Sequence, residues 1–191
     1  MAEGVTTQPI TIVVVMGVSG CGKSTVAQQL ARRTGWPSAE GDDFHPPANV
    51  AKMRAGIPLT DAERLPWLRA VAEWISDRAR HSESAVVACS ALKRSYRDVL
   101  RGGSTDIFFL HLVASRDVLL TRLRARPDHF MPASLLQSQL DTLQPLQPDE
   151  AGVILSVEEP LEEVVARAFS ALAAAGRVPA PGSRPDRDGR G

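Results

Sequence analysis

Apolar runs and helix-like patterns alternate along most of the chain. Several short runs are almost wholly apolar, as expected for strands that are buried on both faces of a sheet. The predicted strands are residues 10–16, a short run that ends near Glu40, and residues 85–89, 107–112 and 152–157. Between them, apolar residues recur at the three- and four-residue spacing of amphipathic helices. This alternation predicts an α/β fold of three layers, in which helices cover both faces of a parallel sheet.

The segments between the strands predict the helices. They are residues 23–34, residues 48–55, a long helix that begins at Asp61, a loop and helix over 90–98, residues 115–126, a helix over about 136–143, and a closing helix over 161–172. Asp61 is predicted to be the N-cap of the long helix, because an Asp carboxylate accepts hydrogen bonds from the free N–H groups of a first turn. Trp67 and Trp74 are expected to pack this helix into the core.

The domain boundaries follow from where these patterns begin and end. Residues 1–9 precede the first strand and are expected to be flexible. Residues 10–176 are expected to form a single domain, with an insert at about 42–82 and a lid at about 122–145. Residues 177–191 are rich in Pro, Gly, Arg and Asp without periodicity, which predicts a disordered tail.

Composition excludes several classes of protein. The 191 residues carry 22 Lys and Arg against 22 Asp and Glu, so the net charge favours neither nucleic acid nor an anionic membrane as a partner. No apolar stretch is long enough to span a bilayer, and the first residues lack the pattern of a signal peptide. The two cysteines, Cys21 and Cys89, do not make a disulfide framework. We therefore expect a cytoplasmic, enzyme-sized domain with free thiols.

A glycine-rich motif separates the first strand from the first helix. It reads G-x-x-x-x-G-K-S-T, and its residues are Gly17, Val18, Ser19, Gly20, Cys21, Gly22, Lys23, Ser24 and Thr25. A strand before it and a helix after it are the context of a phosphate-binding P-loop, in which backbone N–H groups and the helix N-terminus face the phosphates. Lys23 is expected to reach the β- and γ-phosphates of ATP, and Ser24 to offer a hydroxyl to Mg²⁺.

Asp42 indicates what is done with the bound nucleotide. The N-K-x-D run of GTPases is absent, and no acidic residue directly follows the strand at 85–89, where ATPase motors hold Mg²⁺. Asp42 instead follows the second strand, at the edge of the sheet where ligands bind. A carboxylate there can accept the proton of a substrate hydroxyl or hold Mg²⁺ through water. This arrangement favours a small-molecule kinase over a switch or a motor.

Basic side chains after the second and third strands suggest an anionic acceptor. Together they could form a pocket for an acidic substrate, although each alone could equally belong to a solvated helix face. They are His45, Lys52, Arg64, Lys93 and Arg97. The last two lie four apart on a predicted helix, so they are expected to share a face.

Two further arginines predict a lid. Arg122 and Arg126 lie four apart on one predicted helix face, immediately before a break at residues 127–132. Cations on a mobile segment beside a nucleotide neutralise charge during phosphoryl transfer, so we expect both to be catalytic. The alternative is a surface helix that happens to bear arginines.

Several stretches together are more specific than the P-loop alone. They are residues 17–24, Gly41-Asp42 with His45-Pro46, Pro66-Trp67-Leu68, residues 89–93 with Tyr96-Arg97-Asp98, Arg122-Leu123, His129-Phe130, and Gln139 with Thr142-Leu143-Gln144. From about Ile10 to Phe169 the chain resembles the gluconokinase family. The resemblance implies a fold like that of nucleoside monophosphate kinases, ATP and Mg²⁺ as cofactors, and frequently a homodimer. It also implies phosphorylation of D-gluconate at its terminal hydroxyl to 6-phospho-D-gluconate. His129 is added to the predicted substrate-binding residues by its position and chemistry.

Two other interpretations stay open at this point. The same fold could act on another small acceptor, such as shikimate, a nucleoside monophosphate or another sugar acid. The chain could also be a nucleotide-binding module without phosphoryl transfer, although such a module needs neither a base nor a lid.

Overall fold

The sheet is built from parallel strands. The computed structural model describes residues 10–104, 106–125 and 134–179. In this part of the chain the strands are β1 Ile12–Met16, β2 Ser38–Glu40, β3 Ala85–Ala88, β4 Ile107–Val113 and β5 Gly152–Ser156. They lie in the order β2-β3-β1-β4-β5, and every neighbouring pair is parallel. The predicted α/β class is confirmed, and the strand bounds lie close to those predicted.

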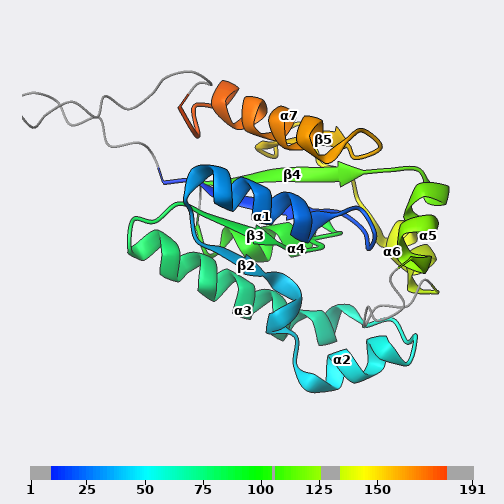
Figure 1. Ribbon diagram of the computed structural model, residues 1–191. Coiled ribbons are helices and arrows are strands. Elements are labelled where there is room, and N and C mark those ends of the chain that lie inside the picture. The colour runs from blue at the N-terminus through cyan, green and yellow to red at the C-terminus, as the bar shows by residue number, and fades with distance from the viewer. Residues whose placement is uncertain (1–9, 105, 126–133, 180–191) are drawn as a thin grey trace, which may run out of the picture.

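Helices cover both faces of the sheet. α1 Lys23–Thr34 and α7 Leu161–Ala174 pack on one face, and α3 Asp61–Arg80 and α4 Arg94–Arg101 pack on the other (Figure 1). The remaining helices gather toward one end of the molecule; they are α2 Pro47–Arg54, α5 Arg116–Arg124 and α6 Leu135–Thr142, with a short 3₁₀ helix at Gly41–Phe44. None of the helices in the described ranges is long and apolar enough to cross a membrane.

Strand β1 lies at the centre of the hydrophobic core. All of its residues are fully buried. Val13 and Val15 pack on the side of α1 and α7, whereas Ile12, Val14 and Met16 pack on the side of α3 and α4. A strand that is buried on both faces needs an apolar residue at every position, which explains why its sequence does not alternate.

The long helix α3 begins differently from the prediction. Its N-cap is Thr60, whose hydroxyl accepts a hydrogen bond from the N–H of Glu63 at 3.3 Å. In return, the carboxylate of Glu63 accepts from the N–H of Thr60 at 2.8 Å. This capping box satisfies two backbone donors that the helix cannot pair internally. The prediction of Asp61 as the N-cap is therefore wrong, and its carboxylate is left to bind other side chains.

The described chain continues past the predicted end of the domain. The N–H of Arg177 donates to the carbonyl oxygen of Leu172 at 2.8 Å, and its guanidinium lies 3.1 Å from the carboxylate of Asp106. Val178 is buried and belongs to the core beside α7. The prediction that a disordered tail begins at residue 177 is therefore wrong, because an apolar side chain there completes the core. The predictions for residues 1–9 and 180–191 lie outside the described residues.

His111 is a polar residue inside the sheet. It lies on β4, is 1% exposed, and neither ring nitrogen has a hydrogen-bond partner among the described residues. Burial, with a smaller contribution from the charge of Arg97, lowers the pKa of His111 from 6.5 to about 4. The ring is therefore neutral in the folded protein at pH 7.

We expect the protein to lose stability as the pH falls from 6.5 toward 4. In this range a histidine of the unfolded chain binds a proton while the buried His111 does not, so acid favours the unfolded state. His111 accounts for about 2 kcal/mol of the decrease in the free energy of unfolding between pH 7 and pH 5. Urea unfolding at the two pH values measures this loss, and His111→Phe should remove that share.

Two other histidines provide the comparison for this measurement. Burial also lowers the pKa of His45 to about 4, so His45 contributes in the same direction and continues to do so in His111→Phe. His81 is exposed, and His81→Gln is the matched substitution at a surface histidine. A pH dependence of His111→Phe equal to that of the wild type would contradict the assignment.

Candidate active site

The P-loop lies at the middle of the sheet edge, directly after β1. Gly17 has a φ of 138°, and a Cβ there would lie 2.6 Å from the carbonyl oxygen of Leu112. Gly22 has a φ of 86° and is the N-cap of α1. Both positions favour glycine, because other residues are strained in this conformation. The loop therefore turns sharply and directs the N-terminus of α1 at the space where phosphates would bind.

Lys23, Ser24 and Glu40 form a polar cluster beside this loop. The ammonium of Lys23 donates to the carbonyl oxygen of Val18 at 3.2 Å. The hydroxyl of Ser24 donates to the carboxylate of Glu40, which is the last residue of β2. Burial raises the pKa of Glu40, and the hydrogen bond from Ser24 opposes this shift. Glu40 was not among the site residues predicted from the sequence, although an acidic residue at a strand end beside Asp42 is a signal that could have found it.

Ser24 and Glu40 have the chemistry of a Mg²⁺ site. A hydroxyl and a carboxylate are hard oxygen ligands, and Mg²⁺ in kinases takes further ligands from phosphates and water. Among the described residues, no group of three or more His, Cys, Asp or Glu side chains could hold a metal. A Mg²⁺ ion at Ser24 would share its coordination with a nucleotide.

Asp42 lies in the 3₁₀ turn that follows β2, at the predicted edge of the sheet. This turn is pressed against β3, because a Cβ on Gly41 would lie 2.4 Å from the carbonyl oxygen of Ala88. From the side of α3, the indole N–H of Trp67 donates to the carbonyl oxygen of Gly41 at 2.6 Å. The turn is thus held by β3 on one side and by α3 on the other, and these two contacts fix the backbone beside Asp42.

His45 stacks on Trp67, with ring centroids 4.2 Å apart and ring planes inclined by 13°. Its Nε2 lies 3.9 Å from Oδ1 of Asp42. Burial lowers the pKa of His45 to about 4 against the opposing charge of Asp42, so the ring is neutral at pH 7. A neutral imidazole can donate one hydrogen bond to a polar substrate through its N–H and accept another at its second nitrogen. The structure brings Asp42 and His45 together.

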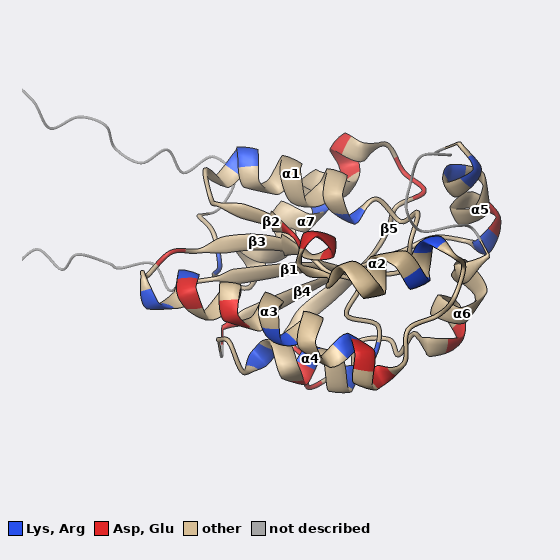
Figure 2. Cartoon of the chain, turned by 90° about the horizontal axis from the view of Figure 1, so that it is seen from below, with Lys and Arg blue, Asp and Glu red and all other residues tan. Residues whose placement is uncertain are grey.

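The two predicted lysines are paired with carboxylates of α3. Nζ of Lys52 lies 2.5 Å from Glu63, and Nζ of Lys93 lies 2.7 Å from Asp61. The hydroxyl of Tyr96 also donates to Asp61, at 2.6 Å. Charges of both signs are interspersed along α3 and α4 (Figure 2). Both lysine side chains remain partly exposed, so a polar substrate can still reach them.

Arg64 differs from these lysines, because it makes no ion pair with any described acidic side chain. Its Nε donates to the carbonyl oxygen of Leu59 at 3.3 Å. Its guanidinium carbon lies 5.9 Å from the centre of the Tyr96 ring. Arg64 is also close enough to His45 and Asp61 to interact electrostatically with both. Of the predicted substrate-binding cations that are described, Arg64 is the best placed to receive an anion.

Arg97 is a structural residue, and its predicted role in substrate binding is wrong. It is fully buried, and its guanidinium donates to both carboxylate oxygens of Glu150, at 2.7 and 2.6 Å. It also donates to the carbonyl oxygen of Gln144 at 3.0 Å. Burial would raise the pKa of Glu150, but hydrogen bonds, first from Arg97, lower it to about 2. Since α4 begins only at Arg94, Lys93 and Arg97 do not share a helix face.

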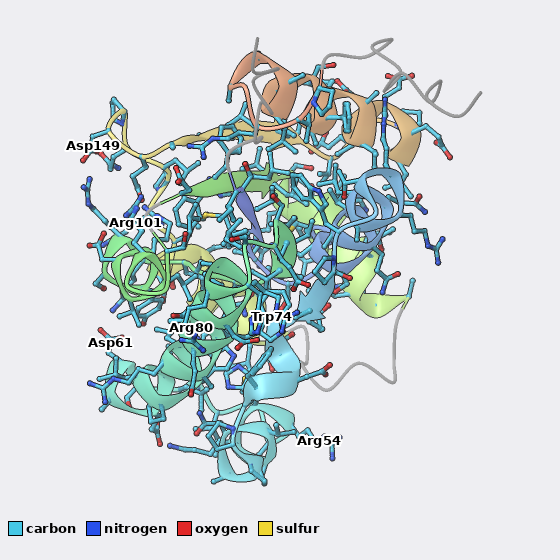
Figure 3. All side chains as sticks on the ribbon, turned by 90° about the vertical axis from the view of Figure 1, so that its left-hand side faces the viewer. Arg54, Asp61, Trp74, Arg80, Arg101 and Asp149 are labelled. Atoms are coloured by element: carbon cyan, nitrogen blue, oxygen red, sulfur yellow. The ribbon has the colours of Figure 1, made fainter. Side chains whose placement is uncertain are left out.

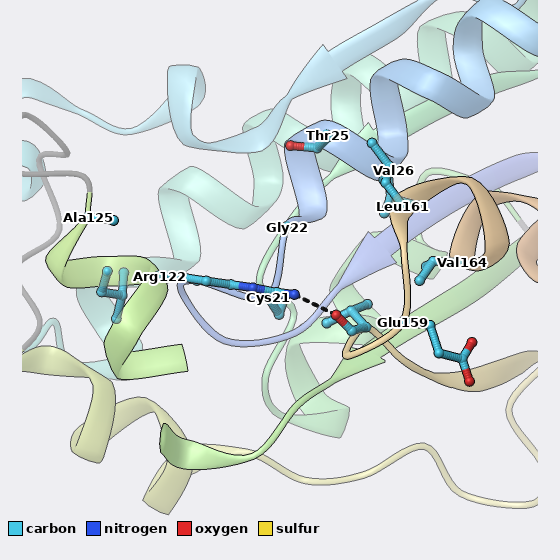
Figure 4. A pocket seen from close by; sticks show the side chains of 12 residues that line it. Cys21, Gly22, Thr25, Val26, Arg122, Ala125, Glu159, Leu161 and Val164 are labelled. Carbon is cyan, nitrogen blue, oxygen red and sulfur yellow. Dashed lines mark hydrogen bonds between the residues drawn. The ribbon is translucent and has the colours of Figure 1, made fainter. Parts of the chain in front are cut away.

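A cavity of about 370 Å³ lies beside the P-loop. Its walls come from the P-loop and α1, from α5, and from the segment that joins β5 to α7 (Figure 4). They consist of Gly20, Cys21, Gly22, Thr25, Val26, Arg122, Leu123, Ala125, Val157, Glu159, Leu161 and Val164. Arg122 reaches across from α5 and donates to the carbonyl oxygen of Val157 at 2.6 Å. The predicted lid residue Arg122 therefore faces the same cavity as the P-loop, whereas Arg126 and His129 lie outside the described residues.

The segment after β5, including the start of α7, is a part of the candidate site that was not predicted from the sequence. Val157, Leu161 and Val164 give the cavity an apolar wall. All strands of the sheet are parallel, so the segment after the last strand emerges at the same edge as the P-loop. An apolar wall beside a phosphate-binding loop suits the flat base of a nucleotide.

Comparison with known proteins identifies the family. A sequence model of the AAA domain family matches residues 12–146. The gluconokinase of Gluconobacter oxydans (strain 621H) is 53% identical over 146 residues, which span 76% of this chain and 82% of that protein.

Solved structures agree with this match. A gluconokinase from Sinorhizobium meliloti 1021 has 48% sequence identity and a TM-score of 0.79, over 88% of this chain and 94% of that chain. An unliganded sugar kinase from Janibacter sp. HTCC2649 has 52% identity and a TM-score of 0.84, over 88% of this chain and 97% of that chain. The predicted P-loop kinase fold is thereby confirmed, and the chain belongs to the gluconokinase family.

Proposed function

We propose that this chain transfers the γ-phosphoryl group of ATP to the terminal hydroxyl of D-gluconate, giving 6-phospho-D-gluconate and ADP. The observation that carries the proposal is that a P-loop and the carboxylate of Asp42, with the neutral His45 beside it, lie at one edge of the sheet. Membership of the gluconokinase family supports gluconate as the acceptor.

ATP and Mg²⁺ are the proposed cofactors. The phosphates would lie against the backbone N–H groups of the P-loop, with Lys23 at the β- and γ-phosphates. The base would occupy the cavity beside Val157 and Leu161. Ser24 and Glu40, whose side chains lie together, would hold Mg²⁺. When bound, the ion supplies positive charge that stabilises the transferring group.

Asp42 is the proposed base or positioning group for the acceptor hydroxyl. Phosphoryl transfer passes through a loose transition state, so positioning and neutralisation of charge matter most. As the acceptor oxygen bonds to the γ-phosphorus, its proton passes to Asp42, and the bond from that phosphorus to the bridging oxygen of ADP breaks. His45 would orient the acceptor, and Arg122 would neutralise charge on the phosphates. The roles of Arg126 in the lid and of His129 at the acceptor stay predictions.

Arg64 is the proposed partner of the gluconate carboxylate. Gluconate is an anion with several hydroxyls, so it needs a cation for one end and polar side chains along its length. A guanidinium binds a carboxylate through two parallel hydrogen bonds. Lys52 and Lys93, held in place by Glu63 and Asp61, would donate to substrate hydroxyls.

Two features of the whole molecule complete the proposal. Cys21 and Cys89 are buried and free, which suits a reducing compartment such as the cytoplasm. The family resemblance implies that a homodimer is frequent, and light scattering of the purified protein measures the oligomeric state.

An acceptor panel tests the proposed function. We expect the purified chain, with ATP and Mg²⁺, to release ADP when D-gluconate is added, and we expect product analysis by NMR to place the phosphate on the terminal hydroxyl. Shikimate, nucleoside monophosphates and other sugar acids are the competing acceptors. Turnover with one of these and not with gluconate would favour the alternative acceptor. Binding of ATP without transfer to any acceptor would favour a nucleotide-binding module.

Asp42→Asn should lower kcat by about 10²- to 10⁴-fold, because the amide cannot take the proton of the acceptor hydroxyl. The dissociation constant of ATP should stay nearly unchanged, because Asp42 contacts the acceptor rather than the nucleotide. Steady-state kinetics and a fluorescent ATP analogue measure the two quantities. Asp43→Asn is the matched control: it makes the same chemical change at an exposed neighbouring residue and should behave like the wild type. Equal losses of kcat in both variants would speak against a specific role of Asp42.

Arg64→Gln should raise the KM for gluconate by about 10- to 100-fold, with a smaller effect on kcat. The physical reason is that the carboxylate is bound alike in the ground state and in the transition state, far from the reacting hydroxyl. Arg54→Gln is the control, since Arg54 is an exposed arginine on α2 (Figure 3). An unchanged KM in Arg64→Gln would assign the carboxylate to another cation.

A further inference from the structure

Gln139 lies on α6 at the point where this helix meets the P-loop. Its Oε1 accepts a hydrogen bond from the backbone N–H of Ser19 at 2.7 Å, across 120 residues of sequence. Both residues are buried. Gln139 belongs to a stretch that resembles the gluconokinase family, yet the function proposed above gives it no role.

The first turn of α6 packs against the predicted insert at about 42–82, which carries Asp42, His45 and Arg64 and is called the acceptor insert below. Leu135, Met53 and Leu59 form a small cluster of buried apolar side chains. Met53 belongs to α2, and Leu59 lies just before α3, so this cluster joins α6 to the segment that carries Arg64. Gln139 and Arg64 line the same small gap beside the cluster. One helix therefore contacts both the donor loop and the acceptor insert.

The end of α6 is tied to the loop between β3 and α4. The N–H of Gln144 donates to the carbonyl oxygen of Leu92 at 2.8 Å. The side-chain oxygen of Gln144 accepts from the N–H of Arg94, also at 2.8 Å. Because this end is held, a shift of the acceptor insert would act on the first turns of α6 and so on the contact between Gln139 and Ser19.

We propose that Gln139 is a positioning residue that couples the acceptor insert to the P-loop. A loop that binds phosphates through backbone N–H groups must hold its peptides in fixed directions, since the groups act at short range. Gln139 holds the peptide of Ser19, and Leu135 holds the insert on the same helix. Transfer is then fast only when the insert, α6 and the P-loop are packed together. This inference rests on the proposed function, because it concerns transfer to the same acceptor.

Gln139→Met tests the positioning role, because Met has a similar length and volume but lacks the amide oxygen. We expect kcat with gluconate to fall about tenfold, as for the loss of one buried hydrogen bond. The KM for gluconate and the dissociation constant of ATP should change little, since neither ligand contacts this oxygen in the proposal. Gln137→Met is the matched control, because Gln137 lies on the exposed side of α6 and donates to Asp141. Its kcat should equal that of the wild type.

A double-mutant cycle distinguishes coupling between the acceptor insert and the P-loop from a purely local effect of Gln139 on the P-loop. Met53→Ala weakens the contact of the insert with α6 and leaves the hydrogen bond of Gln139 in place. If α6 couples the two sites, the effects of Met53→Ala and Gln139→Met on kcat are not additive. Urea unfolding of each variant distinguishes a loss of stability from a loss of kcat.

Two results would overturn the inference: additive effects on kcat, or a Gln139→Met variant with the kcat of the wild type. A wild type that does not phosphorylate gluconate would instead contradict the proposed function. The two failures are therefore distinguishable.

Discussion

The complete burial of β1 is the constraint on which the rest of the site depends. This strand lies in the middle of the sheet and is apolar on both faces, so the loop that follows it emerges at the centre of the carboxyl edge. The turn after β2 and the segment after β5 emerge at the same edge and bring Asp42 and Val157 toward this loop. Gly17 and Gly41 approach the carbonyl oxygens of neighbouring strands at distances that no Cβ would allow. The donor site and the proposed base thus depend on backbone contacts within the sheet, which are less mobile than surface loops.

The carboxylates of the framework determine which cations are available to a substrate. Glu150 binds Arg97 inside the protein, where a charge without a partner would be costly. Asp61 binds Lys93 at the surface, where the pair is worth little energy but restricts the direction of the lysine. Arg64 has no such partner among the described residues. A chain with no formal net charge can therefore present a local positive group to an anion.

Much of the fold and the contiguous parts of the candidate site could be predicted from local patterns. The P-loop was predictable because the glycines, Lys23 and Ser24 are contiguous and are flanked by a strand and a helix. Asp42 was predictable because it directly follows a strand. The error at Arg97 has a different origin: a helical spacing of four residues places side chains on one face only if the helix includes both, and α4 begins after Lys93. Glu40 was missed because its partner Ser24 lies on a different element, the helix α1.

The sequence by itself determined the order of strands and helices, the parallel sheet, the phosphate-binding loop and the family. These features depend on the hydrophobic periodicity of the chain and on contiguous motifs. Both determine local structure, because the residues involved are close together in the sequence. Only the tertiary structure decided that Arg97 is buried, that Val157 and Leu161 line the cavity, and that Gln139 holds the P-loop. Each of these depends on contacts between segments far apart in the chain, 53 residues for Arg97 with Glu150 and 120 for Ser19 with Gln139. Spacing along the chain does not record which distant segments meet, because the packing of helices on the sheet sets those contacts.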